Sequence, residues 1–206
     1  MPDLQIDPQR TAVLIEIMQN EFTSPEGEFW KAGLNGESAM ALIPAMTRVC
    51  EAARAAHIPI FATRLTVFTD LDGRGVGIGH MATFRPFLAR AGLRDGTWGH
   101  QITSDLPKPD YEFRKWAYSA FHRTEFDHML SALGIEHLIL VGIATNIAIE
   151  STGRDAVHRG MRITTVSDCV SSYVQALHDA SLQNLANLGT VVTSDELIAA
   201  LQSTPG

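Results

Sequence analysis

The sequence predicts an α/β fold, a three-layer sandwich in which helices cover both faces of a six-stranded, mainly parallel sheet. Two observations predict it. Short apolar segments rich in β-branched residues alternate along the chain with segments whose apolar residues recur at helical spacing, which is the order of β-α-β units. The chain has 206 residues, 45% hydrophobic and 19% charged, as expected of one globular domain, which we place at residues 1–206.

The first half of the chain supplies two predicted strands. Residues 11–17 form an apolar run that predicts a buried strand. After a loop rich in Gly, Pro and Glu, residues 38–56 carry apolar side chains three and four positions apart, which predicts an amphipathic helix. Residues 57–63 predict the second strand, with Pro59 near its start, where a missing N–H donor is tolerated.

The segment from about residue 65 to 110 is rich in Gly, Asp and Arg and shows no clear periodicity. A stretch of this length inside a compact domain is typical of a binding loop or lid, or of short helices that the pattern does not reveal. We therefore expect a lid-like excursion over about 65–110. It contains no motif that identifies a substrate.

Regular alternation returns in the second half of the chain. Thr124 is expected to cap one helix, and Gly160 to end the next. The predicted strands are 111–115, 138–143, 162–167 and 190–193, and the predicted helices are 124–134, 146–159, 175–188 and a last one beginning at Ser194.

Composition excludes several classes of protein. The net charge is −7, and acidic and basic residues are interspersed, which disfavours a nucleic-acid or anionic-membrane partner. No apolar run approaches the ~18 residues of a membrane span, and residues 1–10 do not resemble a signal peptide. The two cysteines, Cys50 and Cys169, are far apart, which predicts buried thiols in a reduced, cytoplasmic protein. The eight histidines include no pair spaced for zinc, so we expect no metal.

Three strand ends carry the candidate chemistry, because parallel sheets bind ligands beyond the carboxyl ends of their strands. Glu16 stands at the first of these ends and Lys115 at the third. The turn at residues 143–148 follows the fourth strand and opens a helix. A buried lysine can exchange protons or hold an anion, and amides at a helix N-terminus stabilise an oxyanion. This arrangement predicts an enzyme acting on a small molecule.

The residues at these strand ends resemble the isochorismatase-like hydrolases, often called cysteine hydrolases. The likeness extends from Thr11 to about Leu201 and is strongest over residues 142–156, Gly-Ile-Ala-Thr-Asn-Ile-Ala-Ile-Glu-Ser-Thr-Gly-Arg-Asp-Ala. Residues 115–121 and 18–22 agree in order and spacing. The resemblance implies a Rossmann-like topology and hydrolysis of C–N bonds in small amides, ureides or carbamoyl compounds, with neither a metal nor an organic cofactor.

The same resemblance implies the site residues. The family's triad is an Asp (sometimes Glu) after the first strand, a Lys after the third and a Cys after the fourth. Lys115 matches the lysine, and the Cys position falls on Ala148. The resemblance also implies a cis peptide between Ile143 and Ala144 and an oxyanion hole of amides near Ala144 and Ala148. The other residues expected to contact the substrate are Gln19, Phe22, Tyr118, Thr145 and Asn146.

Ala148 departs from the family pattern, because a methyl group is no nucleophile. One explanation is an experimental replacement of Cys by Ala. The other is a natural chain without the thiol, either a pseudoenzyme that only binds a small molecule or a hydrolase of another mechanism. Vinyl-ether cleavage of the isochorismatase type is such a mechanism, since it needs an acid and no thiol.

The acid position is also irregular. An ungapped alignment places the family's Asp on Ile17 and leaves Glu16 one residue early. Because side chains alternate across a strand, this offset turns Glu16 to the opposite face. A β-bulge at the strand end would re-aim Glu16 into the cleft as the general base; without one, the acid is lost.

We therefore expect an amide, ureide or carbamoyl hydrolase that is inactive, or nearly so, with Ala148 in place. A pseudoenzyme or small-molecule binding protein, and a thiol-independent vinyl-ether hydrolase, remain as alternatives. The expected partner is a small molecule. Helix faces rich in Ala and Leu, such as residues 176–188, together with the resemblance, predict a homo-oligomer, a dimer or tetramer.

Overall fold

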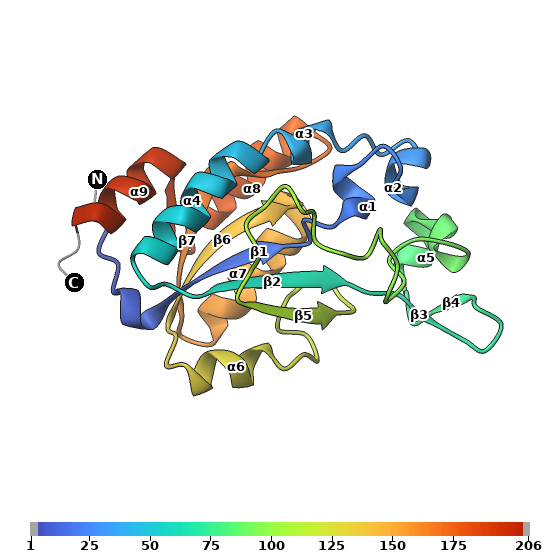
Figure 1. The fold of residues 1–206 in the computed structure, drawn as a ribbon, viewed down its shortest axis with the longest axis horizontal. Helices are drawn as coiled ribbons and strands as arrows, with labels where there is room; N and C mark the ends of the chain where they lie inside the picture. Colours follow the sequence, from blue (N-terminus) through green and yellow to red (C-terminus); the bar gives the residue numbers. More distant parts are fainter. Residues whose placement is uncertain (1–3, 204–206) are drawn as a thin grey trace.

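The computed structural model describes residues 4–203, and its centre is a parallel sheet of six strands in the order β5-β2-β1-β6-β7-β8 (Figure 1). Every neighbouring pair in this sheet is parallel. The predicted α/β class with its six-stranded sheet is confirmed. The strands are β1 (Thr11–Glu16), β2 (Ile60–Leu65), β5 (Tyr111–Lys115), β6 (His137–Ile143), β7 (Arg162–Ser171) and β8 (Thr190–Val192).

Helices cover both faces of the sheet, as the alternation of side chains along β1 makes plain. Val13 and Ile15 pack into a core shared with α4 (Ile43–Ala55) and α9 (Ser194–Ser203). Ala12 and Leu14 point the other way, into a second core. Three helices close that core: α6 (Phe126–Ala132), α7 (Glu150–His158) and α8 (Gln175–Ala186). Each β1 side chain is therefore assigned to a layer by its position in the strand.

Several element boundaries differ from the prediction for local reasons. The helix expected over 38–56 is divided into α3 (Glu37–Met40) and α4, whose first turn contains Pro44. Proline is favoured in a first turn and disfavoured inside a helix, so a new helix begins there. The helix expected over 146–159 begins with a π-helical turn, η3 (Thr145–Ile149), before α7.

The excursion at 65–110 contains short elements that periodicity did not reveal. They are the antiparallel pair β3 (Phe68–Thr69) and β4 (Gly75–Val76), helix α5 (Met81–Phe84) and the 3-10 turn η2 (Pro86–Ala89). Figure 1 shows them together beyond the carboxyl ends of β2 and β5, near two more short helices, α1 (Asn20–Thr23) and α2 (Glu28–Lys31).

The chain changes direction across the sheet between β1 and β6, and the carboxyl ends of these two strands form the topological switch point. Gly142 approaches β1 closely there: it has φ +110°, and a Cβ on it would lie 2.3 Å from the Glu16 carbonyl oxygen. Only glycine is compatible with this position. The close approach brings the ends of β1 and β6 to one place.

The two cysteines are buried, as expected. Cys50 and Cys169 are free thiols buried in the core, and burial raises the pKa of Cys50 to about 12, which keeps it protonated and unreactive. Among residues 4–203, no helix is long and apolar enough to cross a membrane.

His137 is a buried titratable group at the start of β6. It is 2% exposed, its Nε2 lies 2.9 Å from the Thr164 hydroxyl and its Nδ1 lies 3.4 Å from the Thr11 hydroxyl. Burial, helped by the charge of Arg162, lowers the pKa of His137 to about 4. The folded protein therefore holds a neutral imidazole that the unfolded chain would protonate below about pH 6.5.

We expect this histidine to make the fold sensitive to acid. Because the unfolded state binds the extra proton, its contribution is complete above about pH 6.5 and is lost as the pH falls towards 4. The loss of unfolding free energy between about pH 7 and 4.5 should be about 2 to 3 kcal/mol. Urea unfolding of His137→Gln should show a smaller loss than the parent chain, whereas exposed His158→Gln should match the parent. Equal losses in all three proteins would contradict the assignment.

Candidate active site

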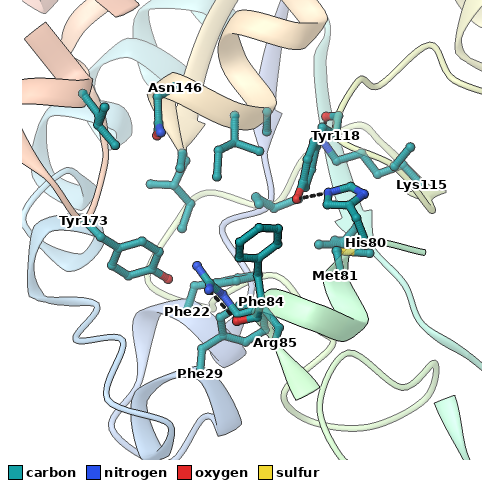
Figure 2. A pocket seen from close by; sticks show the side chains of 18 of the residues that line it. Phe22, Phe29, His80, Met81, Phe84, Arg85, Lys115, Tyr118, Asn146 and Tyr173 are labelled. Atoms are coloured by element: carbon teal, nitrogen blue, oxygen red, sulfur yellow. Dashed lines mark hydrogen bonds between the residues drawn. The ribbon is translucent and has the colours of Figure 1, made fainter. Parts of the chain in front are cut away.

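A cavity of about 590 Å³ opens at the carboxyl ends of the strands, next to the switch point (Figure 2). Its wall is made by the residue after β1, the end of β5, the turn after β6, the excursion at 65–110 and the segment before α8. The predicted site residues that line it are Ile17, Phe22, Lys115, Tyr118, Ala144, Asn146 and Ala148. Glu16, Gln19 and Thr145 are not among the lining residues.

Lys115 is held at the cavity wall by a buried ion pair with Glu16. Its Nζ lies 2.5 Å from Glu16 Oε2 and donates a second hydrogen bond, of 2.7 Å, to the Tyr118 carbonyl oxygen. The side chains of Lys115 and Glu16 are 1% and 0% exposed. Burial lowers the pKa of Lys115 from its ordinary value of 10.5, and the charge of Glu16 opposes that shift.

Glu16 is satisfied on both carboxylate oxygens. Oε2 accepts a hydrogen bond of 2.5 Å from the Thr63 hydroxyl of β2 in addition to that of Lys115, and Oε1 accepts one of 2.6 Å from Thr152 of α7. Pairing of β1 with β6 continues without interruption from Thr11 to Glu16. The β-bulge that would have turned Glu16 into the cleft is therefore absent from β1. The Glu16 side chain lies on the α7 side of the sheet and does not line the cavity. It pairs there with the ammonium group of Lys115.

Ile17 occupies the place in the cavity where the ungapped alignment puts the family's acid. It follows β1 with φ +43° and is 8% exposed. A positive φ is strained for a β-branched residue, whereas Asp and Asn adopt it more readily. Ile17 lines the cavity, so the position after β1 contributes an apolar side chain rather than a carboxylate.

The turn after β6 brings Ala148 to the cavity. The cis peptide between Ile143 and Ala144 that the resemblance implied is present. The Ala144 carbonyl oxygen accepts hydrogen bonds from the amides of Ile147 and Ile149, at 3.0 and 3.3 Å, which fixes the η3 turn. Ala148 is 1% exposed and lines the cavity at this turn.

Two of the residues expected to contact substrate have other partners. The Gln19 side chain donates to the carbonyls of Leu65 and His100 and accepts from the amide of Leu65, so it ties the end of β1 to the excursion. The Thr145 hydroxyl lies 2.9 Å from Nδ1 of His178 and is buried. Both are placed to support the backbone around the cavity. Asn146 does line the cavity, and its Oδ1 accepts a hydrogen bond of 2.6 Å from Ser172.

Sequence patterns did not identify Arg85 and Tyr173 as site residues, although both line the cavity. Arg85 lies between α5 and η2 in the excursion, and Tyr173 precedes α8. His80, at the start of α5, also lines the cavity, and its Nε2 lies 2.5 Å from the Tyr118 hydroxyl (Figure 2). These residues come from segments with no periodic pattern, so only the folded chain shows that they share one wall.

The described residues do not supply a set of metal ligands. No group of three or more His, Cys, Asp and Glu side chains within residues 4–203 is arranged to hold a metal ion.

A profile of the isochorismatase domain matches residues 11–196, which include every strand of the sheet. The chain belongs to the isochorismatase family.

Similar proteins in this family have named activities. Ureidoacrylate amidohydrolase RutB of Pseudomonas syringae pv. syringae is 34% identical over 166 residues, which are 75% of this chain and 68% of the relative. The protein of the same name from Methylobacterium radiotolerans is 29% identical over 215 residues, covering 98% of this chain and 82% of the relative.

Solved structures of isochorismatase-family members share the fold. A cysteine hydrolase from Pseudomonas syringae pv. phaseolicola 1448A has a TM-score of 0.85 and 27% identity, covering 96% of this chain and 95% of that chain. N-carbamoylsarcosine amidase from Thermoplasma acidophilum has a TM-score of 0.72 and 25% identity, covering 90% and 97%.

We expect removal of Lys115 to destabilise the fold strongly. Lys115→Met leaves the Glu16 carboxylate buried without its counter-charge, which should lower the free energy of unfolding by about 3–5 kcal/mol. In the double variant Glu16→Gln/Lys115→Met no charge is stranded, so the loss should be smaller than the sum of the single losses. Urea unfolding followed by circular dichroism measures both.

Lys31→Met is the matched control, because Lys31 forms an exposed ion pair with Glu28. It should leave the unfolding midpoint nearly unchanged, since exposed pairs contribute little. Strictly additive losses in the Glu16 and Lys115 variants would show that the two groups do not depend on each other.

Proposed function

We propose that this isochorismatase-family chain has the cavity of an amidohydrolase for a small amide, ureide or carbamoyl compound, and that with Ala148 in place it binds such a compound without cleaving it. The observation that carries the proposal is the position of Lys115, which lines the same cavity as Ala148 of the η3 turn and is paired with Glu16 outside the lining. The named activities of the relatives, ureidoacrylate amidohydrolase and N-carbamoylsarcosine amidase, support the same bond type.

The chemistry assigned to position 148 follows from its location. It lies in the η3 turn, directly before α7, where backbone amides and the helix dipole favour negative charge. A thiol there would be easier to ionise, and its attack on a carbonyl carbon would place the oxyanion near these amides. Release of the amine and hydrolysis of the resulting thioester would complete C–N cleavage. Alanine supports the binding step alone.

The position of Glu16 in the fold favours a different role from the general base expected from the sequence. Because it accepts three hydrogen bonds and does not line the cavity, it is a positioning residue for Lys115 rather than a general base in contact with substrate. Vinyl-ether cleavage requires an acid against the substrate, and no Asp or Glu of the described residues lines the cavity. The geometry therefore gives this alternative no support.

A second candidate function, a small-molecule binding protein, is favoured by one observation. Both positions where the resemblance implies reactive groups, 17 and 148, carry apolar side chains that line the cavity. A cavity with apolar side chains at both positions can still bury a ligand but has no reactive group there. Restoring the two groups distinguishes the candidates.

We expect two substitutions to install turnover. The parent chain should release no ammonia from a panel of small amides, ureides and carbamoyl compounds. Ala148→Cys should release some, and Ile17→Asp/Ala148→Cys should be at least about a hundredfold faster, since a placed general base contributes at least that much. Asp also tolerates the backbone of position 17.

Ala117→Cys is the control, because it puts a thiol on the cavity wall outside the η3 turn. Mass spectrometry should detect an acyl thioester on the peptide that contains position 148, and only in the active variants. If the double variant stays folded and is inert across the panel, the amidohydrolase proposal fails and the binding protein remains.

We also propose a homo-oligomer that uses the beginning of α8. Leu185, near the end of the Ala- and Leu-rich segment, is buried in the core, so only part of that face is free. Val174 and Leu177 are 51% and 48% exposed and form an apolar surface there, which also borders the cavity.

Sedimentation velocity should therefore give a mass of a dimer or larger for the parent chain. Leu177→Asp should shift the distribution towards monomer, because a charge on a contact surface opposes association. Exposed Leu71→Asp, in the tip between β3 and β4, should leave it unchanged. A monomeric mass for the parent chain would overturn the proposal.

A further inference from the structure

The cavity has an unbalanced charge in its wall, and the group that carries it is Arg85. Lys115 is balanced by Glu16, but the ion pairs within residues 4–203 include none with Arg85. The one hydrogen bond of its side chain within these residues runs from Nη1 to the Phe84 carbonyl oxygen, at 2.7 Å. The cation is half-buried beside an apolar cavity with no Asp or Glu among the described lining residues.

Nearby carboxylates are engaged elsewhere. Arg85 also lines a second groove, called here the outer groove, which it shares with Glu28 and Arg90. Glu28 pairs with Lys31 at 2.8 Å rather than with Arg85. Glu28 therefore forms no ion pair with Arg85, although both line this groove.

Polar groups accompany Arg85 on the same side of the cavity. Figure 2 shows its guanidinium between Phe84 and Tyr173, with the Tyr173 hydroxyl directed towards it. Its positive charge also acts on the hydroxyl of Tyr118, where it opposes the rise in pKa that burial causes. A guanidinium beside the Tyr173 hydroxyl matches a planar oxyanion, because its N–H groups can donate two parallel hydrogen bonds.

Most of the remaining wall is apolar. Phe22, Phe29 and Leu65 line it together with Ile17 and Ala148 at the strand ends. A volume of about 590 Å³ lies in the range that holds a molecule well above the size of a simple amide. The wall thus supplies one anion-binding end and an extended apolar body.

We propose that the cavity selects organic acids, molecules with an aromatic or branched apolar body and a terminal carboxylate that Arg85 binds. This inference deepens the proposed function, on which it rests for the identity of the site: in an active form, the scissile C–N bond would lie towards position 148 and the carboxylate towards the excursion. Arg85 then determines the preference for a carboxylate. It lies in the excursion at 65–110, outside the motifs at the strand ends.

The test uses three probes on the full chain by isothermal titration calorimetry. They are 3-phenylpropanoate, its neutral counterpart 3-phenylpropanamide and acetate, which has the charge without the ring. We expect 3-phenylpropanoate to bind about tenfold or more tightly than the amide, since a desolvated charge-assisted pair contributes at least that factor. Acetate should bind far more weakly than either, because it leaves the apolar wall uncovered.

Arg85→Gln should abolish the preference for the carboxylate while leaving affinity for 3-phenylpropanamide unchanged, and Arg85→Lys should retain part of it. Arg90→Gln is the matched control, because Arg90 lines the outer groove and not the cavity. Circular dichroism confirms that each variant is folded. Equal affinity of the parent chain for the acid and the amide, absence of binding by both, or a preference that survives in Arg85→Gln, would overturn the proposal.

The outcome is separable from that of the proposed function. If Ile17→Asp/Ala148→Cys hydrolyses neutral amides as fast as amides that carry a carboxylate, the amidohydrolase proposal stands and the role of Arg85 falls. If that variant is inert while the Arg85-dependent preference is present, the cavity is a binding site for organic acids and the hydrolytic proposal falls.

Discussion

The buried ion pair between Glu16 and Lys115 is the constraint on which the rest of the site depends. It joins the carboxyl ends of β1 and β5 across β2, and hydroxyl groups of Thr63 and Thr152 complete it from β2 and α7. A charge at such depth is tolerated only when it is paired and hydrogen-bonded. The network therefore fixes the relative position of three strands and a helix, and it places a lysine at the cavity wall as a consequence.

The position of Glu16 outside the cavity lining also explains why the cavity is largely apolar. Successive residues of a strand point to opposite faces, so Glu16 at the end of β1 lies on the α7 side, and Ile17 follows on the side of the cavity. The charge of the lysine is balanced outside the space that a ligand would occupy. Most side chains that face that space are apolar, and Arg85 of the excursion adds a cation to them. Both proposals about ligand binding follow from this separation of charge.

The framework of the chain and the residues at positions 17 and 148 relate differently to the isochorismatase family. The chain has the sheet, the lysine at the end of β5 and the cis peptide after β6 that the resemblance implies. Positions 17 and 148, to which the resemblance assigns an acid and a thiol, carry Ile and Ala. A framework held by its own buried network does not need those groups for stability.

The sequence by itself determined the α/β class, the six strands and the candidate lysine, because alternation of apolar runs and the residues at strand ends are local properties. The predicted helix boundaries were wrong where a single residue interrupted the periodic pattern of apolar residues, as Pro44 does at the start of α4. The tertiary structure alone decided that Glu16 meets Lys115, 99 positions away, that Gln19 holds the excursion rather than a ligand, and that Arg85 completes the cavity. These depend on contacts between segments distant in the chain, and no local pattern encodes where an aperiodic segment will lie.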